Sequence, residues 1–165
     1  MKYIAYISAL ALLAGCATTD KDNGAPGNQF TFHLYHVHPF AKQPLGGGGV
    51  LDLEKGEEKT VLQSPFIIRR CETPDSCRQG VVTIISELTL LEQTPQHAKI
   101  ALHALVKIGK AGTFKTPNTE ITTTIPEGVP VITQDFSLNR TVVLASGKTQ
   151  SIQLMPEASI LVGMK

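Results

Sequence analysis

The chain has 165 residues, a length at which a single domain with one hydrophobic core is expected. It carries 15 Lys and Arg residues against 14 Asp and Glu residues. This near neutrality, without a basic run, excludes nucleic acid as an expected partner, because phosphate backbones are bound mainly through positive charge. Tryptophan is absent, aromatic residues make up 5% of the chain, and frequent Val, Ile, Leu and Thr favour strands.

The first 15 residues predict a signal peptide. Lys2 precedes an apolar run from Ile4 to Leu13, about ten residues, which is the length of a signal-peptide core and too short for a transmembrane helix. Removal of residues 1–15 leaves 165 − 15 = 150 residues. The loss of Lys2 brings the basic count to 15 − 1 = 14, equal to the acidic count, so the mature chain is neutral.

The apolar run closes with Leu13-Ala14-Gly15-Cys16, which resembles the lipobox of bacterial lipoproteins. The resemblance implies that diacylglycerol is attached to the Cys16 thiol, that the chain is cut before Cys16, and that the new amino terminus is acylated. Two or three acyl chains suffice for stable anchoring, since each buried methylene contributes about 0.8 kcal/mol. Ala17, in place of Asp, implies transfer to the outer membrane, with the domain on its periplasmic face. The alternative is an ordinary secretory peptide cut elsewhere.

Residues 16–28 are predicted to form a lipidated, flexible tether. The stretch after Cys16 is rich in Asp, Asn, Gly and Thr and has too little apolar surface to order itself. The folded part is therefore expected to be one β-sandwich domain over residues 29–165.

Gln29–His38 is the first predicted strand, because a period of two places alternate residues on one face: Phe30, Phe32, Leu34, His36 and His38. Residues 39–49 contain two prolines and four consecutive glycines, which predict a mobile loop. Val50–Glu54 predicts a short strand, and Lys55–Glu58 a turn. Thr60–Cys71 is a further β-rich run.

Cys71 and Cys77 remain once Cys16 is lipidated, and they flank a turn that contains Pro and Asp. Because an exported protein meets an oxidising compartment, a Cys71–Cys77 disulfide is expected to close this turn and pin a hairpin tip. A metal-binding pair and a redox pair are the alternatives, although the spacing is wider than in thioredoxin-like or zinc-knuckle motifs.

Gly80–Glu92 is nearly continuous in apolar character and predicts a central strand. The segment Ala98–Ile108 fits the sequence pattern of a strand and also that of a helix. Alternation of apolar and polar residues indicates a strand, whereas Pro95 in a first turn, three alanines and a closing Gly109 suit a helix over residues 95–108. We expect a strand, because it forms a hairpin with the preceding run and the rest of the chain is β-like.

The last third of the chain predicts more short strands. Thr119–Ile125 is rich in Thr, Val131–Ala145 alternates, and residues 146–148 predict a tight hairpin into Thr149–Leu154. Ala158–Met164 supplies the final strand. The total of about eight or nine mostly antiparallel strands is typical of a β-sandwich.

The order of the Val81–Leu91 strand, the Ala98–Ile108 strand, a polar loop and Thr141–Thr149 resembles the final β-hairpins of bacterial secretins. The resemblance covers about half of the chain. The sequence departs from that pattern by lacking the Gly-Gly pair that typically ends the secretin motif, and the chain is too short to form a pore.

His36 and His38 are the strongest candidates for a metal site. Side chains two residues apart on a strand point the same way, with Cβ atoms about 6.5–7 Å apart, so the two imidazoles could hold Zn or Cu. His97 or His103 could add a third ligand, whereas His33 points to the other face. The plainer interpretation is that these histidines line a strand end.

The sequence supports three classes of function. The leading hypothesis is a non-enzymatic lipoprotein that serves an envelope assembly as an interaction or structural component and requires no cofactor. The alternative is an envelope lipoprotein that binds metal or another ligand through His36 and His38. An enzyme that acts on envelope polymers is the third, although motifs for a catalytic nucleophile are absent from the sequence.

Overall fold

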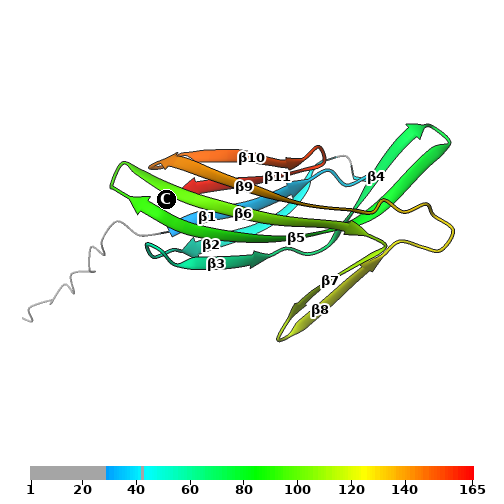
Figure 1. The fold of residues 1–165 in the computed structure, drawn as a ribbon, viewed down its shortest axis with the longest axis horizontal. Helices are drawn as coiled ribbons and strands as arrows, with labels where there is room; N and C mark the ends of the chain where they lie inside the picture. Colours follow the sequence, from blue (N-terminus) through cyan, green and yellow to red (C-terminus); the bar gives the residue numbers. More distant parts are fainter. Residues whose placement is uncertain (1–28, 42) are drawn as a thin grey trace, which may run out of the picture.

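The computed structural model describes residues 29–41 and 43–165, so the predicted signal peptide, Cys16 and the tether lie outside the described residues. The described part is all-β, as predicted (Figure 1). Within it there is no helix that could cross a membrane. Its eleven strands are β1 Gln29–His36, β2 Leu45–Asp52, β3 Glu58–Leu62, β4 Phe66–Thr73, β5 Ser76–Gln93, β6 His97–Gly109, β7 Ala111–Thr116, β8 Thr119–Thr124, β9 Gln134–Ala145, β10 Thr149–Met155 and β11 Ala158–Met164.

The strands form two main sheets and one separate hairpin. Sheet A has the order β10-β11-β1-β2, and sheet B has the order β3-β5-β6-β9. Strand β4 joins sheet B on the same edge of β5 as β3, so the 18-residue β5 pairs with β4 along its first half and with β3 along its second. All of these ladders are antiparallel, and within the described part of the chain β7 and β8 pair only with each other.

One hydrophobic core lies between the two sheets, which makes the domain a β-sandwich. Phe30, Phe32 and Leu34, alternate residues of β1, are buried as the alternation predicts, and β11 and β10 add further apolar side chains from sheet A. Sheet B covers them mainly with β5 and β6. The core residues with the least exposure include Phe30, Phe32, Leu53, Ile68, Ile84, Leu88, Leu90, Ile100, Leu102 and Leu144.

Strand β6 resolves the ambiguity of residues 95–108 in favour of the predicted strand. Its buried positions alternate without a break, from Ala98 to Ile108. It pairs with β5 on one side and β9 on the other, so its backbone groups are satisfied by neighbouring strands rather than within a helix. The prediction of β5 as a central strand is likewise confirmed.

The predicted mobile loop over residues 39–49 is wrong for residues 45–49, because residues 45–52 form strand β2 along β1 in an uninterrupted register. Glycine is needed here at two positions. A Cβ atom at Gly46 or Gly48 would overlap the carbonyl oxygens of Leu34 and Phe32, respectively. The glycine run is therefore the result of close approach between strands.

The predicted tight hairpin at residues 146–148 is also wrong. Strand β9 belongs to sheet B and β10 to sheet A, so these residues carry the chain from one sheet to the other. Gly147 adopts φ +68° and donates its N–H to Met164 O at 3.1 Å, while Ser146 N–H bonds to Gln96 O at 2.8 Å. The Thr141–Thr149 segment, which carried the resemblance to secretin hairpins, is thus no hairpin.

Smaller differences concern strand ends and number. Strand β1 ends at His36, two residues before the predicted end, and the predicted run 60–71 is divided at Pro65 into β3 and β4. Strand β7 lies in a stretch predicted as loop. These divisions bring the count to eleven strands instead of eight or nine.

The sandwich has two distinct ends. The end that we call the terminal end holds Gln29 and Lys165, whose N–H bonds to Gln29 O at 3.1 Å. The end that we call the arm end holds His36, the β10–β11 turn at Glu157, and the β4–β5 hairpin, which extends beyond the sandwich body (Figure 1). The two termini of the domain therefore lie opposite the projecting hairpin.

Candidate functional site

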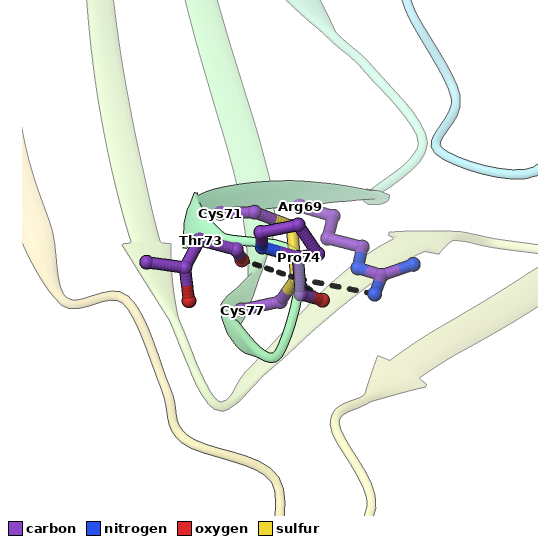
Figure 2. The surroundings of a disulfide bond; sticks show 5 residues. All are labelled: Arg69, Cys71, Thr73, Pro74 and Cys77. Atoms are coloured by element: carbon purple, nitrogen blue, oxygen red, sulfur yellow. Dashed lines mark hydrogen bonds between the residues drawn. A yellow bond between two sulfur atoms is a disulfide. The ribbon is translucent and has the colours of Figure 1, made fainter.

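The tip of the β4–β5 hairpin, residues 69–79, is called the disulfide arm here. Cys71 and Cys77 face each other across the ladder and form the predicted disulfide. Figure 2 shows the Arg69 guanidinium against this bond, where Nη2 donates to Cys77 Sγ at 3.1 Å. The disulfide closes the turn at Thr73–Ser76, where the ladder register shifts. The arm is thus a covalently closed, exposed tip.

The base of the disulfide arm is held by the segment that precedes β9. Gln79 donates its N–H to Pro130 O at 3.0 Å and accepts from Ile132 N–H at 2.8 Å. Gly80 beside it has no room for a side chain, because a Cβ would press on Ile108 and Ile132. These contacts fix the direction of the arm relative to sheet B.

Arg70 ties the base of the arm to sheet A. Its Nε donates to Glu157 Oε1 at 2.7 Å and its Nη2 to Glu157 Oε2 at 3.0 Å, a bidentate pair between β4 and the β10–β11 turn. This hydrogen bonding lowers the pKa of Glu157 below its ordinary value. At the tip, Arg78 pairs with Glu72. Two of the three arginines near the disulfide are therefore already paired with carboxylates.

Exposed apolar side chains gather at the arm end of sheet A. Phe40 is 68% exposed and Val37 is 55% exposed, and both follow the end of β1. Tyr35 and Leu45, near the adjoining ends of β1 and β2, are also exposed. A hollow of about 210 Å³ lies beside them, between the end of β1 and the β10–β11 turn. Apolar surface of this kind is typical of sites that contact a partner.

His36 and His38 lie at the same end, and their ring centroids are 6.5 Å apart. The His36 ring stacks on Phe66 at 4.0 Å, and its Nδ1 is buried without a hydrogen-bond partner among the described residues. His38 lies beyond the end of β1, and its Nδ1 accepts from Phe40 N–H at 3.3 Å. Two imidazoles that share one tetrahedral zinc have ring centres about 5 Å apart, so the two rings would have to approach each other to bind it.

The predicted third ligand is not beside this histidine pair. In the described ranges, no group of three or more His, Cys, Asp or Glu residues is close enough to hold a metal ion. His97 lies at the terminal end, where Thr94 Oγ1 is 3.0 Å from its Nδ1 in the β5–β6 turn. Metal binding by His36 and His38 stays a prediction, which a zinc titration of the His36→Phe variant tests.

Sequence reasoning missed the pairing of His103 with Glu87. Their Nδ1 and Oε2 atoms are 2.8 Å apart on the outer face of sheet B, where the register of β5 and β6 places the two residues opposite each other. They lie in an open hollow of about 440 Å³ together with Asn139 and Thr141 of β9. The period of two in each strand indicates the face on which Glu87 and His103 lie. It does not show that they are opposite each other, because that depends on the strand register.

Comparison of the chain with protein-family models, with curated proteins and with solved structures finds no match.

Removal of the disulfide by the double exchange Cys71→Ser and Cys77→Ser is expected to lower the free energy of unfolding by about 2 kcal/mol, because a short closed loop no longer restricts the unfolded chain. The effect should be local as well. Amide hydrogen exchange in the disulfide arm should accelerate, since its β4 part pairs only with β5. Reduction of the wild-type protein should reproduce both changes. Unaltered stability and unaltered exchange would show that the arm does not depend on the bond.

Exchange of His36 for Phe is expected to weaken the dependence of stability on pH. Burial, with the nearby His38, lowers the pKa of His36 below its ordinary value of 6.5, so the unfolded chain takes up this proton at a higher pH than the folded protein. Stability is therefore complete above about pH 6.5 and declines as the pH falls toward the folded pKa. Phe keeps the stacking on Phe66 and removes this decline, which urea unfolding at pH 5 and pH 7 measures. His33→Gln is the matched control and should leave the decline in place.

Proposed function

We propose that this chain is a non-enzymatic lipoprotein of the cell envelope, held at the periplasmic face of the outer membrane by lipid on Cys16. It serves an envelope assembly as an interaction or structural component, and it contacts its partner through the arm end. The observation that carries the proposal is the position of Gln29, which continues from the tether, at the end of the sandwich opposite the disulfide arm.

The length of the tether supports this arrangement. Cys16 and Gln29 are separated by 29 − 16 = 13 residues, which span at most about 45 Å when fully extended. A lipid on Cys16 thus keeps Gln29 within about 45 Å of the bilayer. The arm end, with its exposed Val37 and Phe40, is the end of the sandwich opposite the attachment point of the tether, where it can contact proteins of the periplasm.

The disulfide supports a location of the domain in the periplasm. Disulfides persist in the periplasm and are rare in the cytosol. The Cys71–Cys77 bond fits export of the domain, and the lipobox at Cys16 is the signal that would direct it. The paired arginines of the arm favour contact through shape and apolar surface over attraction to an acidic partner.

Site-specific photo-crosslinking in cells tests the proposal. A benzophenone amino acid at Phe40 should crosslink reproducibly to one envelope protein. The same group at Gln96, an exposed residue of the terminal end, is the matched control and should not crosslink to that protein. Equal crosslinking from both positions, crosslinks from Phe40 to lipid alone, or no crosslinks would each contradict the proposed orientation.

A further inference from the structure

Strand β2 is an edge strand without the usual protection. Among the described residues it pairs only with β1, and its opposite edge is free. Natural edges are usually protected by Lys, Pro or a bulge, but Leu45–Asp52 contains neither residue and its register with β1 is regular over eight pairs. A row of backbone N–H and C=O groups is thus open to another extended chain.

The inner face of β2 is open as well. Gly47 and Gly49 are opposite Leu34 and Phe32 of β1, so they share the face that points toward sheet B. A Cβ atom at either glycine would meet no atom within 4 Å. These two glycines therefore differ from Gly46 and Gly48, which the fold requires, because no close contact demands glycine at 47 or 49.

The space left by these glycines is a hollow of about 350 Å³ between the edges of the two sheets, called here the β2–β3 slot. Gly47, Gly49 and Leu51 line it from sheet A, with Phe32 behind them, and Val61 and Leu62 line it from β3. Leu62 is 48% exposed at its mouth. The slot thus offers apolar contact beside unpaired backbone groups.

We infer that the free edge of β2 and the β2–β3 slot bind an extended segment of a partner protein, which adds a fifth strand to sheet A. Backbone groups of that segment pair with β2, and its alternate apolar side chains enter the slot. The inference rests on the proposed function as an interaction component and names the surface and the kind of segment that it would bind.

A second copy of this chain fits the slot less well. Symmetric antiparallel pairing of two β2 strands about Gly48 places Gly47 opposite Gly49 of the second copy, so the middle of the strand brings no side chain into either slot. An acyl chain would fill the slot but leave the backbone groups of β2 without partners. A segment that alternates apolar and polar residues satisfies both features.

Fluorescence anisotropy of the full-length protein in detergent, with a labelled synthetic peptide that alternates Val or Ile with Thr over about eight residues, tests the inference. The peptide should bind to the wild-type protein. Gly49→Val places a side chain in the slot without a clash with the fold, and it should weaken peptide binding by at least about tenfold. Leu62→Lys, on the opposite wall, should also weaken it. Ser151→Val on β10, the other edge of sheet A, is the control and should leave binding unchanged.

The peptide itself supplies a second control. Methylation of every second backbone nitrogen removes the donors that face β2, and methylation of the other set leaves them. Only the first peptide should lose binding. Absence of binding by the wild-type protein, equal binding by Gly49→Val, equal loss with both methylated peptides, or a β2-mediated dimer in sedimentation that excludes the peptide would each overturn the inference. If only the inference about β2 is wrong, the crosslink from Phe40 should still form. If that crosslink is absent while the peptide still binds, the proposed function is wrong and the inference about β2 is not.

Discussion

Exchange of Cys16 for Ser is expected to abolish lipid attachment at residue 16 and, with it, transfer of the protein to the outer membrane. Serine cannot accept the thioether-linked diacylglycerol that the lipobox resemblance implies, and without it neither the cleavage before residue 16 nor the second acylation should follow. The uncleaved chain has a formal net charge of +1, so it has no strong electrostatic attraction to anionic lipid that could replace the acyl chains. The variant should thus carry no acyl chains and should not reach the outer membrane.

Membrane fractionation, detergent phase partition and the mass of the mature protein measure this change. Wild-type protein should sediment with outer membranes and carry the mass of its acyl chains, and the Cys16→Ser variant should do neither. The Cys71→Ser and Cys77→Ser double variant is the control, because it also loses sulfur atoms but keeps Cys16. A Cys16→Ser protein that still carries lipid and sediments with membranes would contradict the anchor, and with it the proposed orientation of the arm end.

Exchange of Gly48 for Ala is expected to lower the free energy of unfolding by about 3 kcal/mol or more, the cost of an overpacked site that only a backbone shift can relieve. The added Cβ would overlap Phe32 O, a backbone atom of the neighbouring strand, as well as the His33 side chain. Relief would require β2 to move away from β1 along part of their ladder. Urea unfolding of both proteins measures the difference.

Gly49→Ala is the matched control, because it changes the adjacent residue of the same strand in the same way. Its Cβ meets no atom within 4 Å, and Ala removes conformational freedom from the unfolded chain, so stability should stay equal or rise slightly. Equal destabilisation by the two exchanges would mean that the glycine run is needed for flexibility and not for close approach. The two variants together also test whether residues 45–52 form a strand.

Alternation of apolar and polar residues predicted most of the core. Strand β6 buries every second residue and β1 does so as far as Leu34, and the period of two is visible without knowledge of any partner. Residues 98–108 remained open to a helix because Ala and the flanking Pro and Gly suit both structures. Only the pairing of β6 with β5 and β9 decides between them.

Two sequence predictions were wrong because the structure there depends on pairing between strands that are far apart in the chain. Glycines 46–49 carry no side-chain signal, so the strand that they form is visible only from the close approach of β1. The chain between β9 and β10 has turn residues that suit a hairpin. It crosses between sheets because β10 pairs with β11 and β9 with β6.

By itself the sequence determined the all-β class, the position of the Cys71–Cys77 disulfide and the faces of the strands that enter the core, because these depend on local alternation and short spacing. The tertiary structure decided which residues meet across strands, such as Glu87 with His103 and Arg70 with Glu157. It also decided that β2 has a free edge beside an open slot. Strand order and register are properties of segments far apart in the chain, and no local pattern encodes them.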